Sequence, residues 1–90
     1  MLERKAEVLQ AMGQPTRLKI LALLGQGERC VCDLQATLGE LQPTVSRHLA
    51  ILRRAGIVRA RRARNRVVYD LSDPRIASLL EQVDTFVGST

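Results

Sequence analysis

The sequence predicts a mainly α-helical domain that contains one β-hairpin. The chain of 90 residues suits a single domain spanning residues 1–90, and its apolar fraction of 46% is enough for a core. Aromatic residues make up only 2% of the chain, so aliphatic side chains must fill that core, which favours interlocked helices over a β-sandwich. Apolar residues recur at helical spacing along most of the chain, and only the stretch near residues 57–71 has β-prone runs.

Two helices are predicted at the start of the chain. A first helix that ends at Gly13 is indicated by four apolar residues at helical spacing, namely Leu2, Ala6, Leu9 and Met12. A second helix begins near Pro15 and is broken at Gly25 and Gly27. Because this second helix is apolar on most sides, we expect it to be the central helix of the core.

The middle of the chain has the spacing of a helix-turn-helix. A short extended connector over residues 27–31 is followed by a brief helix over 33–38, which closes at Gly39. The turn 39–42 then leads into a helix that starts at Pro43 and ends at residues 55–56. This helix has a buried stripe of Val45, Leu49 and Leu52. At about 100° per residue, Arg47 points away from the stripe and Thr44 and Ser46 lie on its flanks, a surface that suits a DNA major groove.

The β-prone runs 57–61 and 67–71 surround Asn65 and predict a hairpin of two strands. Its tip has Arg64 and Arg66, and residues 41–69 contain eight arginines and no acidic residue. Such a surface attracts phosphates, so the hairpin is predicted to be the wing of a winged helix-turn-helix and double-stranded DNA to be the partner. The alternative is a solvated surface hairpin with incidental arginines.

A last helix is predicted after Ser72 or Asp73, either of which could cap it, with Pro74 inside its start. The helix has one apolar stripe, formed by Ile76, Leu79, Leu80, Val83 and Phe86. A winged core is already closed by the earlier helices, and a chain this short is marginally stable alone. We therefore expect the first and last helices to pair with each other and with a second subunit, giving a homodimer.

This order of elements and three local motifs resemble the ArsR/SmtB family of metal-responsive winged-helix repressors. Residues 11–21 (AMGQPTRLKIL) are similar to the family's entry into its second helix, residues 42–52 (QPTVSRHLAIL) to its recognition helix, and residues 53–58 (RRAGIV) to its step into the wing. The resemblance implies a dimeric repressor that binds an imperfect inverted repeat in its own promoter and leaves when an effector binds.

The same resemblance places the DNA-binding residues. Carried over by position, they are Gln42, Thr44, Ser46, Arg47 and His48 of the recognition helix, with Arg64 and Arg66 of the wing. His48 lies at the edge of the buried stripe, so core-flanking, phosphate-bonding and base-reading roles all stay open. Arg17, which follows Pro15 near a helix start, is interpreted mainly as a structural residue.

Cys30 and Cys32, followed by Asp33-Leu34, resemble the thiol site of the arsenite and antimonite sensors of this family. Thiolates select soft ions, and the start of a helix stabilises their negative charge. The third cysteine of the fuller pattern is Gln35 here, which leaves water, an added thiol such as glutathione, or nothing as the third ligand. The effector is thus expected to be trivalent arsenic or antimony, with cadmium, lead or thiol oxidation as alternatives.

We expect a cytoplasmic protein, because residues 1–5 are not a signal peptide and no apolar run approaches a membrane span. In that compartment the two cysteines are expected to be reduced thiols, because a disulfide at this spacing closes a tight ring and makes a poor reversible pair. The alternative is that both are small buried hydrophobic residues and the sensor lies elsewhere.

Other classes of function have less support. No required cofactor is expected. An enzyme is not expected either, because the sequence has one histidine, no candidate set of nucleophile, base and orienting residue, and no glycine-rich phosphate loop. The family's zinc site on the last helix is not expected here. Its only available ligands would be Asp73, Glu81 and Asp84, whereas zinc favours imidazole and thiolate ligands. The remaining alternative is a soft-metal carrier or protein-interaction module without DNA binding. The eight arginines of residues 41–69 argue against it, because such a protein has no need for them.

Overall fold

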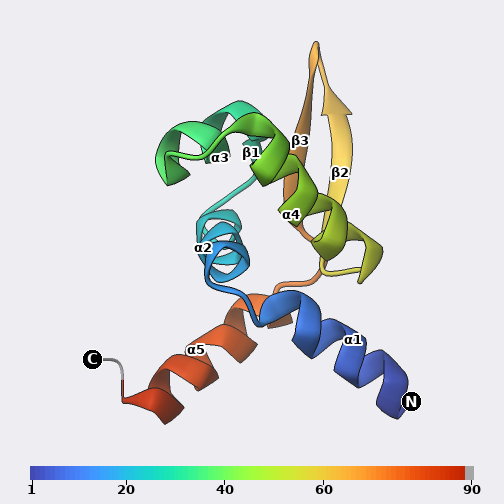
Figure 1. The fold of residues 1–90 in the computed structure, drawn as a ribbon, viewed down its shortest axis with the longest axis vertical. Helices are drawn as coiled ribbons and strands as arrows, with labels where there is room; N and C mark the ends of the chain where they lie inside the picture. Colours follow the sequence, from blue (N-terminus) through green and yellow to red (C-terminus); the bar gives the residue numbers. More distant parts are fainter. Residues whose placement is uncertain (89–90) are drawn as a thin grey trace.

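The computed structural model describes residues 1–88 of the chain (Figure 1). Its helices are α1 (Leu2–Met12), α2 (Pro15–Leu24), α3 (Val31–Leu38), α4 (Gln42–Arg54) and α5 (Arg75–Val87), and its strands are β1 (Arg29–Cys30), β2 (Val58–Ala63) and β3 (Arg66–Leu71). The predicted helices and the hairpin are confirmed. The short helix α3 begins two residues earlier than predicted, so that it includes Cys32.

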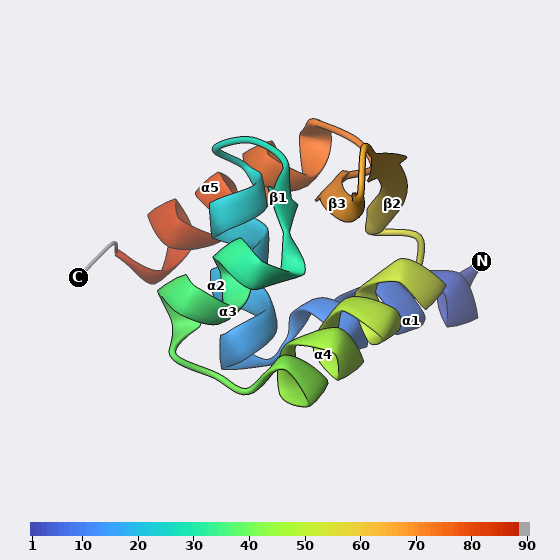
Figure 2. The same cartoon turned by 90° about the horizontal axis from the view of Figure 1, so that it is seen from above.

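The core forms where α2, α3, α4 and the base of the hairpin meet. Figure 2, which looks down the hairpin, shows α2 in the middle of the molecule, with α3 and α4 on one side and α5 on the other. The side chains with under 2% exposure are Ile20, Leu21, Leu24, Leu34, Val45, Leu49 and Leu52. The predicted stripe of α4 is therefore buried completely, which fixes the opposite face of α4 toward solvent.

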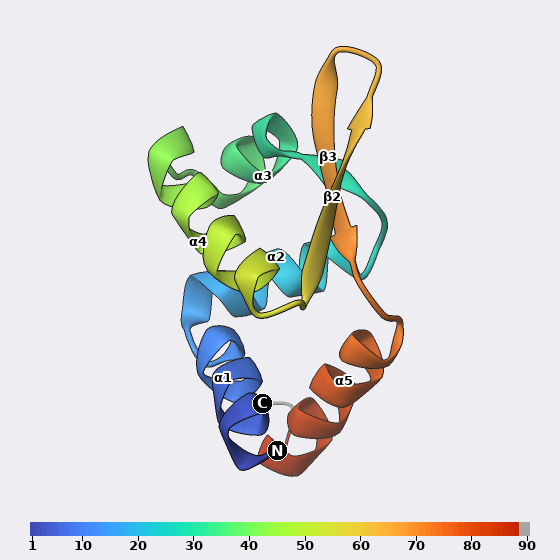
Figure 3. The ribbon, with the colours of Figure 1, turned by 90° about the vertical axis from the view of Figure 1, so that its right-hand side faces the viewer.

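The sheet has three strands in the order β1-β3-β2, all antiparallel: the two strands of the predicted hairpin and β1, which lies within the extended connector expected over residues 27–31. In the added strand, Arg29 faces Tyr69 and Cys30 faces Val68. At the other end of the hairpin, Arg64 occupies the left-handed region with φ 60°, a conformation expected of the neighbouring Asn65. We call residues 58–71 the wing, and Figure 3 shows it projecting from one end of the molecule.

The start of α5 differs from the prediction in two details. The Ser72 hydroxyl donates to the carbonyl oxygens of Gly56 and Ile57 at 2.7 and 3.0 Å and so does not cap the helix. The N-cap residue is Pro74, and Asp73 before it binds the first amide of the helix, because its Oδ1 accepts the Arg75 backbone N–H at 2.8 Å. Hydrogen bonds from the side chain and backbone of Arg75 lower the pKa of Asp73 to about 2. Pro74 lies just before the helix and not inside it.

The helices α1 and α5 project together at the end opposite the wing (Figure 3). None of the α5 residues is buried, and Leu79, Val83 and Phe86 are 43, 47 and 90% exposed. Between the two helices lies an apolar hollow lined by Leu9, Met12, Gly13, Leu18, Leu79, Leu80 and Val83. The chain thus leaves a large apolar surface uncovered, as the sequence predicted. No helix within residues 1–88 is long and apolar enough to cross a membrane.

Candidate nucleic-acid interface and thiol site

The exposed face of α4 is the first part of the candidate DNA interface. Pro43 is tolerated in its first turn because no intrahelical acceptor is available for an amide there. Arg47 and Gln42 are exposed, and Thr44 and Ser46 are half-buried at the sides of the face. Of the residues predicted for base and phosphate contacts, Arg47 thus lies opposite the buried stripe, Thr44 and Ser46 lie at its flanks, and Gln42 is exposed at the first residue of the helix.

His48 is held at the edge of that face by Arg17. The Arg17 Nε donates to the Ala11 carbonyl at 2.6 Å, its backbone N–H donates to Gln14 Oε1 at 2.8 Å, and its Nη1 lies 3.3 Å from His48 Nδ1. Arg17 therefore joins α1, α2 and α4, in agreement with the structural role expected of it.

The contact with Arg17 also sets the protonation of His48. Since a guanidinium only donates, Nδ1 of His48 must accept, and its ring proton lies on Nε2. Burial, followed by the charges of Arg17 and Arg47, lowers the pKa of His48 below its ordinary value. The lowered pKa favours the neutral imidazole, which in this tautomer has Nε2–H as a hydrogen-bond donor.

The arginines of the wing fall into three groups. Arg59 contacts Asp70 at 3.5 Å, and Arg61 Nη2 lies 2.6 and 2.7 Å from the two carboxylate oxygens of Glu28. Arg66 Nη1 donates to the Cys30 sulfur at 3.8 Å. The remaining pair, Arg62 and Arg64, are exposed and have no acceptor within residues 1–88.

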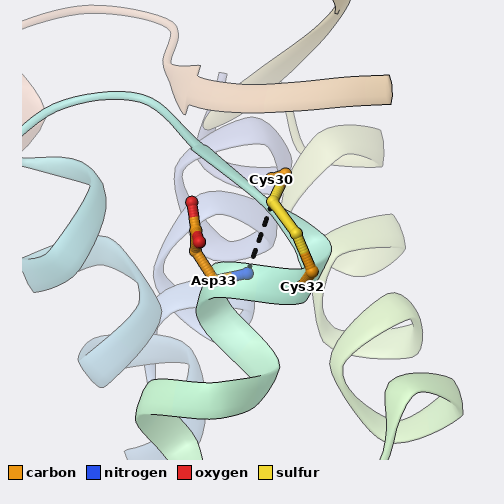
Figure 4. A group of neighbouring side chains, drawn as sticks. All are labelled: Cys30, Cys32 and Asp33. Carbon is orange, nitrogen blue, oxygen red and sulfur yellow. Dashed lines mark hydrogen bonds between the residues drawn. A yellow bond between two sulfur atoms is a disulfide. The ribbon is translucent and has the colours of Figure 1, made fainter. Parts of the chain in front are cut away.

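The thiol site lies where β1 becomes α3 (Figure 4). Cys30 is the N-cap of α3 in an extended conformation, with φ −83° and ψ 167°, and its sulfur accepts the Asp33 backbone N–H at 3.4 Å. Cys30 is 3% exposed, whereas Cys32 in the first turn of α3 is exposed. The irregular start of the helix brings together two side chains that a regular helix would separate.

The structure contains a disulfide between Cys30 and Cys32, whose Cα atoms are 5.3 Å apart. The prediction of free reduced thiols is therefore wrong for this structure. The prediction assumed a regular backbone, in which a disulfide between two residues so close in sequence would close a strained ring. The change from strand to helix between the two residues provides the conformation that joins them.

A third donor group lies beside the two sulfurs. A carboxylate oxygen of Asp33 and both sulfur atoms are all within 4.8 Å of one another. Asp33 was not predicted as a ligand, because the fuller family pattern has its third cysteine at the position of Gln35. The available signal was its position three residues after the N-cap, where the first turn of a helix folds back toward its cap.

Comparison with known proteins places this arrangement in a family. The model of the bacterial regulatory proteins of the arsR family matches residues 14–60, which include α2, α3 and α4. The chain belongs to this family. An uncharacterised HTH-type transcriptional regulator from Methanocaldococcus jannaschii is 45% identical over 83 residues, covering 91% of this chain and 93% of that protein.

Two further similarities relate the arsR-family chain to repressors and to a solved structure. The HTH-type transcriptional repressor SmtB of Mycobacterium tuberculosis is 38% identical over 79 residues, which cover 88% of this chain but only 58% of the repressor. A homodimeric winged helix-turn-helix DNA-binding domain from Mycobacterium bovis is 35% identical with a TM-score of 0.89, covering 96% of this chain and 80% of that one.

These comparisons confirm the winged helix-turn-helix fold and the family predicted from the sequence. Members of the arsR family are transcriptional regulators and not enzymes. The chain is accordingly a DNA-binding domain of that class.

Proposed function

We propose that the protein is a homodimeric transcriptional repressor that a thiophilic metalloid, arsenite or antimonite, releases from its operator by binding at Cys30 and Cys32. The observation that carries this proposal is the position of the thiol site. Its two sulfur atoms and the Asp33 carboxylate lie at the start of the helix that packs directly against the recognition helix α4.

In the proposed complex with DNA, α4 lies in the major groove and the wing lies along the backbone or a minor groove. Arg47 is the strongest candidate for base reading, with Gln42, Thr44, Ser46 and His48 at its sides. The unpaired guanidinium groups of Arg62 and Arg64 contact phosphates. Arg66, a predicted DNA-binding residue, contacts Cys30 in this structure and keeps its phosphate role as part of the proposal.

The effector binds the reduced form of the thiol site, because a disulfide offers no thiolate. Soft trivalent arsenic and antimony bond to both sulfurs, and Asp33 supplies the nearest third donor. Binding draws the three groups together and distorts the start of α3. Leu34 of α3 packs in the same core cluster as the buried stripe of α4, so the distortion is passed to the recognition helix. A coupling of about 1–3 kcal/mol would lower DNA affinity about 5- to 150-fold.

A dimer has two recognition helices, one for each half-site of the operator. The exposed apolar faces of α1 and α5 are the surfaces for it, and the similar domain from Mycobacterium bovis is homodimeric. A two-fold dimer reads an inverted repeat, so the proposed operator has two half-sites about one helical turn apart.

A second candidate signal is thiol oxidation, which the disulfide itself favours. Cadmium or lead would use the same sulfurs as arsenite and counts as a variant of the first proposal. The metal-carrier alternative has less support, because a carrier has no use for wing arginines that face solvent without acceptors.

The deciding experiment measures DNA affinity by fluorescence anisotropy, with duplex DNA from upstream of the protein's own gene. The reduced parent is titrated with and without arsenite, and again after oxidation by diamide. The variant with Cys30→Ser and Cys32→Ser is the matched control, since it keeps the size and burial of both side chains.

Each outcome decides between the candidates. Release by arsenite in the parent but not in the serine variant supports the metalloid sensor. Release by diamide alone supports oxidation sensing. Tight binding that neither reagent weakens overturns the sensor function of the cysteines, and absence of salt-sensitive DNA binding in every form overturns the repressor.

A further inference from the structure

The two sulfur atoms of the disulfide lie in different environments. Cys30 is 3% exposed, and its sulfur accepts hydrogen bonds from the Asp33 backbone N–H at 3.4 Å and from Arg66 Nη1 at 3.8 Å. Cys32 is exposed, and within residues 1–88 no donor contacts its sulfur. One sulfur is therefore open to an incoming reagent, and the other is surrounded by groups that stabilise negative charge.

A thiolate breaks a disulfide by attacking one sulfur along the S–S bond and expelling the other as a thiolate. Attack on Cys32 meets an exposed atom and expels Cys30, whose charge is stabilised by a guanidinium and a helix N-terminus. Attack on Cys30 requires entry into the core and expels Cys32, which lacks those donors. Access and leaving-group stability thus favour the same direction.

We propose that the disulfide exchanges with small thiols of the glutathione class and that Cys32 is the sulfur that receives them. In the first step a thiolate RS⁻ bonds to the Cys32 sulfur, the Cys30–Cys32 bond breaks, and its electron pair leaves on Cys30 as a thiolate. In the second step another RS⁻ attacks the mixed disulfide, which yields RSSR and the Cys32 thiolate.

The exchange assigns separate roles to three residues. Cys32 is the modification site, Cys30 is the protected leaving group, and Arg66 is a positioning residue whose charge meets the developing thiolate. The inference concerns the same cysteine pair as the proposed sensor and describes how that pair returns to the form that binds a metalloid.

The test uses the oxidised full chain and reduced glutathione. Samples are quenched early with an alkylating reagent and acid, and the peptides are mapped by mass spectrometry. The expected species has glutathione on Cys32 and the alkyl group on Cys30. An adduct on Cys30, or equal amounts on both residues, would overturn the proposal.

Single-cysteine variants check the same point without the disulfide. At a pH high enough to deprotonate both thiols, so that access and not the thiolate fraction decides the rate, Cys30→Ser, which leaves Cys32 alone, is expected to form a mixed disulfide with oxidised glutathione about tenfold faster than Cys32→Ser does. Equal rates in two variants with the parent's circular dichroism would contradict the assignment of the open sulfur.

The role of Arg66 is tested through the rate of reduction. Arg66→Gln is expected to slow the first step about tenfold, because it removes a charge-assisted hydrogen bond to the leaving sulfur, and to keep the adduct on Cys32. Lys5→Gln, which removes one positive charge from α1, is the control and should leave the rate unchanged. An unchanged rate in Arg66→Gln refutes its role. None of these readouts involves DNA or arsenite, so failure of the repressor proposal would not affect them.

Discussion

The double variant Arg62→Ala, Arg64→Ala tests which wing arginines contact DNA. Within residues 1–88 neither of these two guanidinium groups has an acceptor, and a dimer would present four such groups. Each phosphate contact contributes about 0.9 to the slope of log affinity against log salt, so the slope should become shallower by about 3.6. Between about 50 and 200 mM salt, the parent would then lose roughly 150-fold more affinity than the variant.

The assay is fluorescence anisotropy on the operator duplex and on an unrelated duplex, because phosphate contacts should weaken binding on both. Arg59→Ala with Arg61→Ala is the matched control: it removes the same charge from the same hairpin, but these two groups already have Asp70 and Glu28 as partners. If the two double variants changed the slope equally, the distinction between free and paired arginines would be wrong. An unchanged slope in Arg62→Ala, Arg64→Ala would remove the wing from the interface.

Three further predictions concern stability and assembly. The lowered pKa of His48 means that the unfolded chain binds a proton at higher pH than the folded one, so the unfolding free energy should fall as pH drops below about 6.5. Urea titrations should show a smaller fall in His48→Gln, and an equal fall would contradict this. Leu52→Ala should lower the unfolding free energy by about 2–5 kcal/mol, because Leu52 is fully buried, whereas Ala50→Ser on the exposed face should change it little. Leu79→Glu with Val83→Glu should convert a dimer to a monomer in sedimentation equilibrium, and a variant that kept the dimer mass would exclude the α5 face.

Helical periodicity predicted the helices well because it reflects burial directly. Val45, Leu49 and Leu52 recur at the spacing of one helix face, and all three have 0% exposure. The buried stripe also fixes the position of Arg47 on the opposite face. Local pattern was therefore sufficient for the recognition helix and for the two strands of the wing.

The thiol site could not be predicted in detail because it depends on contacts between distant segments. The pairing of β1 with β3 joins residues nearly forty positions apart, and no local pattern encodes it. The same holds for Arg66, which was expected at a free hairpin tip and instead contacts Cys30. The disulfide was missed because the sequence spacing alone gives no information on the change of backbone at Cys30.

The pairing of β1 with β3 connects the thiol site directly to the wing. Cys30 is at once the last residue of a strand hydrogen-bonded to the wing and the cap of the helix before α4. A covalent change at Cys30 would act on the wing through one row of backbone hydrogen bonds, and on α4 through the short helix α3 and the turn that follows it. Under the proposed function, the switch would therefore consist of the two reacting cysteines and the short segments that they connect.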